Sequence, residues 1–379
     1  MFTQGLVFPV RLILLAGLLL VLAACGGSGH SLGCPPPACQ IGPGPEFLLA
    51  TTIAGTVQSL KVDAQTGALG AASSAPGPSV SLGLTTVGSK FLYVSDPGNH
   101  AVRAYSIDAT TGALSAVAGS PFALGIFSFP IGLASSQGST HFYAADAGTV
   151  DGFTINATTG VPAPISGSPF PSGTNLFLTT DPAGKFLFAS DEDPPGGILA
   201  FTIDGATGAL TAVPGSPFAI PGQTVLNSQP TGIVIDASGR FLYAALNGSN
   251  QIAAFSITSG TGVLTPVPGA PFLSGTNPLN LAASSKFLYA DSVDLTIWGY
   301  AIDSTTGALA PVAGSPFAFS AAGMVMDPSG RFLFGTRLPG VEVFSVNTST
   351  GAMTPVAGSP FPANGALQIT IVQMPGPGG

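Results

Sequence analysis

The sequence predicts an all-β fold, a seven-bladed β-propeller built from four-stranded antiparallel blades. The first observation is a repeat of 44 to 54 residues, marked by a Thr-Gly pair whose glycine recurs at Gly67, Gly112, Gly160, Gly208, Gly262, Gly307 and Gly351. The second is that each copy divides into four short runs rich in Val, Ile, Phe and Tyr, bounded by turn residues. The third is that no run keeps a helical period. Repeats of this length with four strands each are typical of a propeller.

Each run of a copy has a defined place in the predicted blade. The first strand precedes a polar turn, as in TGIVIDASG at 231–239, and the second follows it, as in RFLYAAL at 240–246. The third resembles AVRAYSID at 101–108, and the fourth resembles LTAVPGSPF at 210–218. Between the third and fourth strands, DATTG at 108–112 predicts a hairpin in which glycine takes positive φ. Because proline cannot donate to a strand ladder, the fourth strand is expected at an exposed edge.

The two ends of the repeat region predict how the ring closes. The first copy begins at EFLLATT, residues 46–52, which reads as a second strand without a first. The last copy ends with ALQITIV, residues 366–372, which reads as a first strand without a blade. We therefore expect the C-terminal strand to complete the first blade.

The residues before the repeats predict export. Residues 1–24 carry a short apolar run typical of a signal peptide, and LAAC at 22–25 resembles the bacterial lipobox. Cys25 is therefore the expected lipidation site, with a plain secretory signal and an incidental cysteine as the alternative. Residues 25–45 then form a lipidated Gly- and Pro-rich tether, the propeller spans 46–374, and 375–379 form a flexible tail.

Two further cysteines, Cys34 and Cys39, lie in the tether as CPPPAC. An exported protein meets an oxidising compartment, so these two are candidates for a small disulfide loop. Zinc is less favoured, because two thiols cannot fill four coordination positions and no histidine pair is near.

The charge balance limits the partners. Nine Lys and Arg oppose seventeen Asp and Glu, for a net charge of −8, and only 7% of residues are charged. Such a chain is not expected to bind nucleic acid. We expect a monomer that is anchored to the bacterial cell envelope through its lipid, in the periplasm or at the cell surface. Its other partner would be a protein, a glycan or a small molecule.

Three phrases carry a resemblance to a known family. GKFLFASD at 184–191, FTIDGATGALTAVPGSPF at 201–218 and DPSGRFLF at 327–334 resemble the lactonase-type seven-bladed propellers, the 6-phosphogluconolactonase-like family. The resemblance covers roughly residues 46 to 374 and rests on strand and turn phrases. It implies the propeller fold and, as an alternative activity, hydrolysis of a lactone.

The repeats allow a test for catalytic residues, because a residue type found in most copies serves the blade. The unrepeated candidates are His100, Arg103 and Arg337. A solvated loop is the alternative for His100, and a strand role is expected for His141, which takes the slot of a phenylalanine. There is no GxSxG, P-loop or dinucleotide fingerprint.

The loops between second and third strands, together with the interblade connections, predict a ligand-binding face. They vary from copy to copy, and variable loops on a rigid scaffold commonly carry function. Their candidate ligand-binding residues are Asp96, Asp191, Glu192, Asp193, Asp291, Asn175, Asn227 and Asn277. Further amides in the connections include Asn280 and Asn364. Solvated loop carboxylates are the alternative interpretation, and a divalent-cation site is another.

These observations leave three functions open. The first is a lipid-anchored binding or scaffold module that acts through its long-loop face. The second is a lactone hydrolase, as the family resemblance implies, in which case the protein is a carboxylic ester hydrolase. The third is a metal-stabilised structural propeller. No cofactor or metal site is predicted, and a divalent cation is the one option left open.

Overall fold

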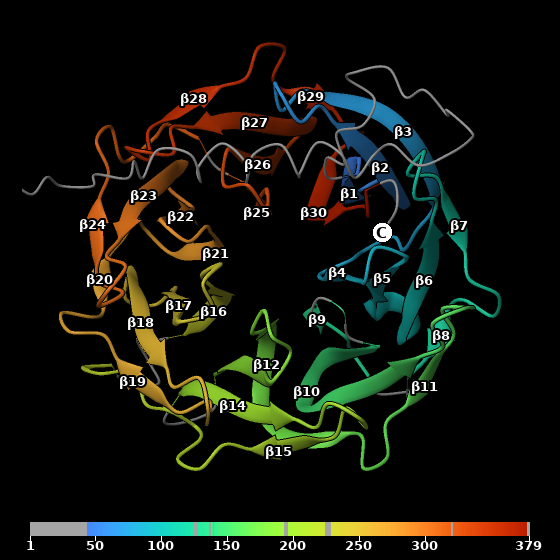
Figure 1. Ribbon diagram of the computed structural model, residues 1–379, viewed down its shortest axis with the longest axis horizontal. Coiled ribbons are helices and arrows are strands. Elements are labelled where there is room, and N and C mark those ends of the chain that lie inside the picture. The colour runs from blue at the N-terminus through green and yellow to red at the C-terminus, as the bar shows by residue number, and fades with distance from the viewer. Residues whose placement is uncertain are drawn as a thin grey trace, which may run out of the picture. The chain divides into compact units, whose positions relative to one another are not determined.

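Seven blades form a closed ring in the computed structural model (Figure 1). The structure describes residues 44–376 except 125–127, 136–137, 139, 193–195, 224–228 and 320, and the side chains of 71, 72, 147, 175 and 176 are not described. The predicted signal peptide, Cys25, Cys34 and Cys39, Asp193 and Asn227 therefore lie outside the described residues. Within the described part of the chain, no helix has the length and apolarity needed to cross a bilayer.

The strands follow one another around the ring in chain order. Blade 1 holds β30 (Ala366–Gln373), β1 (Glu46–Thr52), β2 (Thr56–Val62) and β3 (Leu69–Pro76). Blade 2 holds β4 (Leu84–Val87), β5 (Phe91–Asp96), the 3-10 helix η1 (Pro97–Asn99), β6 (Ala101–Ile107), β7 (Leu114–Ala116) and β8 (Phe122–Ala123). Blade 3 holds β9 (Leu133–Ser135), β10 (His141–Ile155) and β11 (Pro162–Pro164), and blade 4 holds β12 (Phe170–Thr180), β13 (Phe186–Asp191), β14 (Gly197–Ile203) and β15 (Leu210–Ala212).

The remaining three blades continue the same order. Blade 5 holds β16 (Pro230–Ile235), β17 (Phe241–Leu246), β18 (Gln251–Ile257), β19 (Leu264–Pro266) and β20 (Phe272–Leu273). Blade 6 holds β21 (Pro278–Ala283), β22 (Phe287–Ser292), β23 (Thr296–Ile302) and β24 (Leu309–Pro311). Blade 7 holds β25 (Met324–Met326), β26 (Phe332–Arg337), β27 (Gly340–Val346), β28 (Met353–Pro355) and β29 (Phe361–Pro362).

Blades 3 and 4 depart from the predicted pattern of separate sheets. β10 is long enough to fill both the second and the third position of blade 3. β12 begins in the interblade connection, pairs there with β10 and then continues as the first strand of blade 4. The two blades therefore share one sheet.

The hydrophobic core lies between blades rather than within one. One cluster joins Phe186 and Phe188 of blade 4 to Leu242 and Phe255 of blade 5, and further clusters pair other adjacent blades in the same way. The second strands β5, β13, β17 and β22 are buried along their whole length. Because neighbours cover a blade on both faces, its inner strands have no need of charged residues, which accounts for the low charge.

The repeated Thr-Gly turn joins adjacent blades as well as forming a hairpin. A Cβ on Gly307 of blade 6 would lie 2.3 Å from Phe241 of blade 5, so this glycine packs directly on the ring. Beside it, the Tyr243 hydroxyl donates to the Gly307 carbonyl at 2.9 Å. The same hydroxyl contact recurs at Tyr93–Gly160, Tyr143–Gly208 and Tyr289–Gly351. His141 takes the phenylalanine slot beneath Gly208, as predicted.

The fourth strand is shorter than predicted. β15 ends at Ala212 after three residues, and the chain turns away before the Ser216–Pro217 bond, which is cis. Past that turn, Phe218 pairs again with Ile198 of the third strand. The Ser216 hydroxyl accepts from the Ala200 N–H at 2.9 Å and so replaces the missing ladder partner. The serine of the repeated GSPF phrase thus supplies a hydrogen-bond acceptor to an N–H group of the third strand, at the point where the fourth strand is interrupted.

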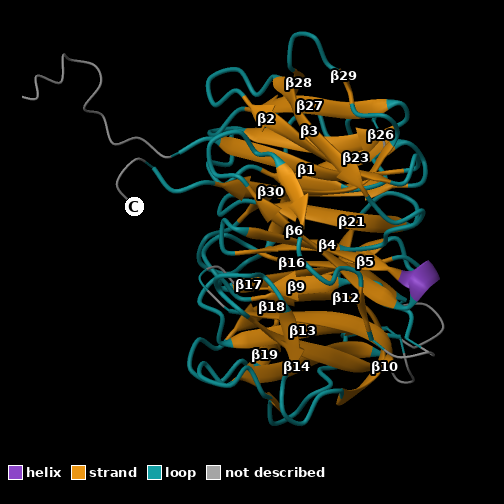
Figure 2. Cartoon of the chain, turned by 90° about the vertical axis from the view of Figure 1, so that its right-hand side faces the viewer, coloured by secondary structure: helices purple, strands orange, loops and turns teal. Residues whose placement is uncertain are grey.

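The predicted ring closure is confirmed. β30 pairs with β1 in antiparallel register, with Phe47 opposite Val372 and Leu49 opposite Thr370. The start of β1 and the end of β30, which pair with one another, lie on one face of the ring, whereas η1 lies on the opposite face (Figure 2). We call these the termini face and the loop face. The loop face carries the turns between second and third strands and the interblade connections.

Candidate functional site

The first strands converge on the ring axis and line a channel at its loop-face end. The cavity there measures about 140 Å³ and is lined by residues from all seven blades. At the innermost position, the aligned residues of blades 2 to 7 and 1 are Gly83, Gly132, Phe177, Gly232, Asn280, Gly323 and Gln368. Glycine is required where neighbouring backbones approach, since a Cβ on Gly232 would lie 2.2 Å from the Leu279 carbonyl. Three blades thus place a side chain where the others have none.

The next residue of each first strand is large and apolar in every blade. These seven residues are Leu84, Leu133, Leu178, Ile233, Leu281, Met324 and Ile369. All of them border the cavity, but their side chains belong to or pack against the hydrophobic clusters between blades. Among the described residues of this lining, the only polar side chains are Asn280 and Gln368, and none is charged. Such a lining favours a neutral ligand, because a charged group would be desolvated without a partner.

Blade 6 places a carboxylate behind this lining where other blades place a hydroxyl. In blade 2, the Ser95 hydroxyl accepts from the Gly83 N–H at 2.9 Å and so holds the first strand. In blade 6, Asp291 does the same, accepting from the Asn280 N–H at 2.6 Å and from the Asn280 Nδ2 at 2.9 Å. Burial raises the pKa of Asp291 to about 6, although hydrogen bonds from Asn280 and Leu279 oppose this rise. The side chain, 2% exposed, remains mostly ionised at neutral pH.

Asn280 and Gln368 approach one another through a shared acceptor. The Ala322 carbonyl of blade 7 lies 3.3 Å from the Asn280 Nδ2 and 3.5 Å from the Gln368 Nε2. The two amides therefore form a short polar arc across blades 6, 7 and 1. This arc can exchange hydrogen bonds with a carbonyl or hydroxyl of a ligand, and Asp291 can hold a proton behind it.

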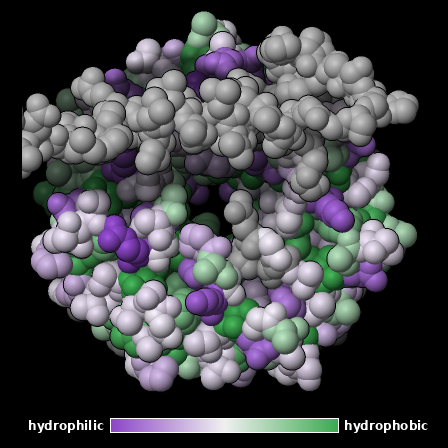
Figure 3. Space-filling view, in the orientation of Figure 1, coloured by the Kyte–Doolittle hydropathy of each residue, from purple (hydrophilic) through white to green (hydrophobic). Residues whose placement is uncertain are grey.

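At the opposite end of the channel, the polar side chains near the axis are mainly hydroxyls. Figure 3 shows the central opening from the termini face. A cavity of about 480 Å³ on this side is lined by strands of blades 1 to 3, with Thr85, Thr86, Ser135 and Thr370 among its residues. The two ends of the channel thus differ in chemistry.

Three of the predicted loop-face carboxylates, Asp96, Asp191 and Asp291, are buried rather than exposed to solvent. Asp96 is fully buried, accepts from Arg103 Nε at 2.6 Å, and also accepts from Asn99 Nδ2 at 2.9 Å. The predicted catalytic candidate Arg103 is therefore committed to an ion pair. Asp191 is buried too, and a Cβ on Gly173 would lie 2.1 Å from its Oδ1, so it packs against the connection that enters blade 4. Glu192 donates its backbone N–H to the Thr174 carbonyl at 3.0 Å.

The other predicted residues are dispersed. His100 is exposed in a left-handed conformation, and its Nδ1 lies 2.6 Å from the Ser128 carbonyl. Arg337 is exposed and stacks over Phe319, with 5.8 Å between the guanidinium carbon and the ring centroid. Neither lines the channel cavity, and they belong to blades 2 and 7. The structure therefore does not assemble the predicted catalytic set at the axis.

The predicted amide residue Asn277 is also not among the described residues that line the channel cavity. Asn277 adopts φ 46° and its Nδ2 donates to the Asn247 carbonyl at 2.8 Å, so it braces two loops of blades 5 and 6. Asn175 pairs through its backbone with Asp191. Sequence reasoning did not single out Gln368 or Phe177. An alignment of the seven first strands could have identified them, because most blades carry glycine at the position where these two residues stand.

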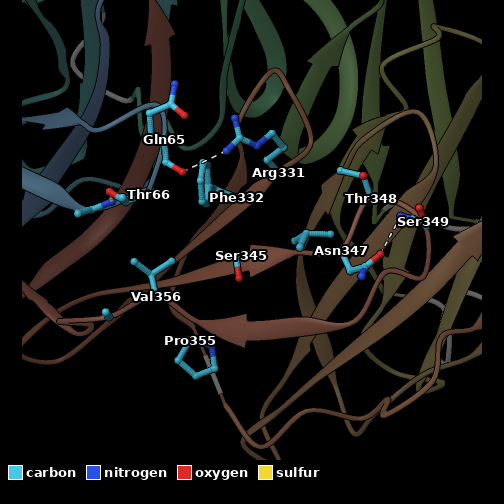
Figure 4. Close-up of a pocket in the computed structure, with 13 residues that line it drawn as sticks. Gln65, Thr66, Arg331, Phe332, Ser345, Asn347, Thr348, Ser349, Pro355 and Val356 are labelled. Atoms are coloured by element: carbon cyan, nitrogen blue, oxygen red, sulfur yellow. Dashed lines mark hydrogen bonds between the residues drawn. The ribbon is translucent and has the colours of Figure 1, made fainter.

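A groove of about 830 Å³ lies at the junction of blades 7 and 1 (Figure 4). Arg331 donates from Nη1 to the Ala64 carbonyl at 3.2 Å and from Nη2 to the Gln65 carbonyl at 3.1 Å. Asn347 Oδ1 accepts from the Ser349 N–H at 3.0 Å. Arg240 likewise donates to the Ser304 carbonyl of the following blade. Since these groups belong to the repeated phrases and already have partners, the groove is part of the blade architecture.

Metal ligands do not gather in the described part of the chain. No group of three or more His, Cys, Asp or Glu side chains is close enough there to hold an ion. The cation alternative for the loop face therefore gains no site among these residues.

Comparison with known proteins agrees with the phrases noted in the sequence. Residues 216–325 match the family model described as "Lactonase, 7-bladed beta-propeller". The predicted resemblance to lactonase-type propellers is confirmed. Comparison with curated protein sequences gives no significant match.

Solved structures of similar fold include three bacterial lactonase-type propellers. A candidate 6-phosphogluconolactonase from Bacteroides uniformis is 21% identical, with a TM-score of 0.70 over 86% of this chain and 99% of that one. A second, from Bacteroides fragilis, is 18% identical, with a TM-score of 0.69 over 86% and 98%. The periplasmic gluconolactonase of Pseudomonas aeruginosa is 20% identical, with a TM-score of 0.67 over 87% and 100%. At this identity the likeness concerns the fold, whereas the family match favours the lactone-hydrolase alternative.

Proposed function

We propose that this chain is an extracytoplasmic binding propeller that takes up a neutral ligand at the loop-face end of its channel. The observation that carries the proposal is the pair of amides, Asn280 and Gln368, which are the polar side chains of an otherwise uncharged ring of first-strand residues. A few oriented polar groups in a concave site are what fixes the orientation of a small ligand. The variable loops around it supply selectivity.

Gln368 offers the sharper test, because Asn280 also supports Asp291. We expect Gln368→Ala to weaken binding of an uncharged lactone by about tenfold, the amount expected for one hydrogen bond of about 1.4 kcal/mol. Isothermal titration with glucono-1,5-lactone measures this. Gln65→Ala, in the groove between blades 7 and 1, is the matched control and should bind like the unaltered protein. Equal affinity in the Gln368 and Gln65 variants would contradict the proposed site.

Hydrolysis of that lactone is the second candidate function, favoured by the family match over residues 216–325. Asp291 is the candidate proton acceptor, because burial raises its pKa to about 6. It lies behind Asn280 rather than in the cavity lining, so water must reach it past that side chain. If hydrolysis occurs there, Asp291→Asn should reduce turnover at least a hundredfold. Turnover in the unaltered protein should fall below pH 6 as the carboxylate is protonated. A pH-stat assay comparing glucono-1,5-lactone with its 6-phosphate tests both, and the uncharged lining predicts preference for the unphosphorylated compound.

The protein's location supports a role outside the cytoplasm. The Pseudomonas aeruginosa relative is a periplasmic protein, and LAAC at 22–25 resembles a lipobox. We expect Cys25→Ser to move the protein from the membrane fraction to the soluble fraction, as measured by immunoblotting. Retention in the membrane fraction would contradict lipid anchoring.

The remaining loop carboxylates stay candidates for contact with a partner. Replacing Asp191, Glu192 and Asp193 with Ala tests this role. Since Asp191 is buried against Gly173, the melting temperature must be measured beside binding.

A further inference from the structure

The loop face concentrates exposed apolar side chains. Among the described residues, nine large hydrophobic side chains are exposed, and eight of them lie in loop-face segments: Ile53, Val80, Phe129, Leu273, Leu279, Val293, Leu295 and Leu338. The ninth, Val161, follows a Thr-Gly turn on the termini face. In contrast, the cations that begin the second strands all belong to the termini face. Apolar side chains clustered on one face mark an interaction surface rather than a random surface.

Five of these residues form an arc over adjacent blades. Leu273 leads into blade 6, Val293 and Leu295 form the loop of that blade, Leu338 forms the loop of blade 7, and Ile53 forms the loop of blade 1. These blades follow one another around the ring (Figure 1). We call these five residues the apolar arc.

The arc carries protruding side chains at one end and a cavity at the other. Leu273, in β20 of blade 5, and Leu295, in the loop of blade 6, are 73% and 62% exposed. Between blades 7 and 1, a cavity of about 380 Å³ is lined by Ile53, Leu338 and Phe361 with three prolines. Knobs at one end and a hole at the other make the surface complementary to a rotated copy of itself.

The exposed charges beside the arc are also self-complementary. Asp294, on the blade 6 loop, accepts from the Thr296 hydroxyl and the Thr276 N–H, and these bonds lower its pKa. Arg337, on the blade 7 strand that leads to Leu338, has no hydrogen-bond or ion-pair partner among the described residues. A two-fold axis between the two residues brings Arg337 of each copy opposite Asp294 of the other.

We propose that the apolar arc is a docking surface for a second copy of this chain, giving a face-to-face dimer. This goes beyond the proposed function and does not depend on it. Leu273 of blade 5 and Leu295 of blade 6 enter the partner's cavity between blades 7 and 1, and two Arg337–Asp294 pairs fix the register. The sequence alone predicts a monomer, because composition does not show where the exposed apolar residues gather.

Sedimentation velocity tests the dimer on the full chain carrying Cys25→Ser, which cannot be lipidated. We expect a sedimentation coefficient that rises with concentration to the dimer value. Leu295→Ser with Leu338→Ser should weaken association at least tenfold, whereas the termini-face control Val161→Ser should leave it unchanged. Melting temperatures establish that each variant is folded. A monomer at every concentration, or association that Leu295→Ser and Leu338→Ser leave intact, overturns the proposal.

A mixing experiment tests the register. Arg337→Glu places two acids opposite one another in the dimer, and Asp294→Lys places two bases there, so each variant alone should be monomeric. Mixed in equal amounts, the two variants should associate, because every contact then joins opposite charges. Failure of the mixture to associate, with both variants folded, overturns the two-fold arrangement.

Discussion

Single hydroxyl groups link neighbouring blades. Tyr243 of blade 5 is buried and donates to the Gly307 carbonyl of blade 6, and burial raises the pKa of this phenol. In blade 4, Phe188 takes the equivalent place. Phenylalanine is therefore accommodated at this position of the fold, and the hydroxyl can be removed without a change of shape.

We expect Tyr243→Phe to lower the free energy of unfolding by about 1–3 kcal/mol, because the buried Gly307 carbonyl loses its donor. Urea denaturation followed by circular dichroism measures the change. Ser256→Ala removes a partly exposed hydroxyl of the next strand. It is the control and should lower the free energy of unfolding by a smaller amount. An unchanged midpoint for Tyr243→Phe would show that the interblade hydroxyl bond contributes nothing.

Glu46 is the one carboxylate at a position where most other blades carry a cation. It is the first residue of β1 and comes just before Phe47, as the cations Lys90, Lys185, Arg240, Lys286 and Arg331 come just before the aligned phenylalanines of their blades. Its side chain is 7% exposed and its Oε1 has no hydrogen-bond partner. Burial, and secondarily the charge of Asp327, raise its pKa from 4.5 to about 7. The neutral form is thus the one that the fold prefers.

This gives a pH dependence of defined sign. Between pH 4.5 and 7 the unfolded chain releases the Glu46 proton while the folded chain retains it, so stability falls as pH rises. Glu46→Gln should remove this loss and raise the free energy of unfolding at pH 8 by an amount on the order of 2 kcal/mol. Thermal melts at pH 8 and at pH 4 measure it, with the difference between the two proteins vanishing at pH 4. A difference that is the same at both values would exclude ionisation as the cause.

At the scale of the strand, the GSPF phrase has an internal control. Five blades carry serine before the proline, and its hydroxyl accepts from a third-strand N–H at 2.9 to 3.0 Å. Blade 5 carries Ala270 there. The same backbone position therefore exists with and without its acceptor in one protein.

Ser216→Ala should lower the free energy of unfolding by about 1–2 kcal/mol, since the Ala200 N–H is left unpaired. The reciprocal change Ala270→Ser should be neutral or stabilising, because it supplies the acceptor that blade 5 lacks. Differential scanning calorimetry of both variants gives the comparison. Destabilisation by both changes to the same extent would mean that packing, rather than the hydrogen bond, decides the residue.

The same elements show what could be predicted from the sequence. Hairpins, edge strands and ring closure follow from local turn chemistry and from counting strands, so they were predictable. The interruption after β15 was not, because a run such as LTAVPGSPF does not reveal that its serine can replace a ladder partner. The carboxylates at Asp96 and Asp191 were expected in loops, yet they are buried. Burial of a charge depends on partners such as Arg103, which lies seven residues from Asp96 and becomes its neighbour only when the hairpin forms.

At the scale of the whole molecule, the two faces have separate roles. The termini face repeats its turns in most blades and takes the chain from its N-terminal segment. The loop face varies, and it holds both the apolar arc and the end of the channel formed by Asn280 and Gln368. The innermost ring position explains why the site was hard to predict. Its residues are mostly glycine for a steric reason, and the few exceptions gain meaning only when seven strands meet at one axis.

β30 joins the two ends of the propeller in one blade, so the cooperativity of unfolding should depend on this strand. β30 contributes Ala366 and Ile369 to the cluster that contains Leu48 of blade 1 and Phe334 of blade 7, and Val372 to the cluster that contains Phe47. Without β30, β1 becomes an open edge strand and both clusters lose the side chains that β30 contributes.

Truncation before Ala366 should therefore abolish cooperative unfolding, seen in circular dichroism as a broad transition without a shared midpoint. Removal of residues 377–379, which follow β30, is the control and should leave the transition unchanged. A variant in which residues 366–374 are moved ahead of Glu46 through a short linker should recover cooperativity, since the same strand then pairs from the other end. A truncated chain that melts like the intact protein would contradict the closure of the ring by its C-terminal strand.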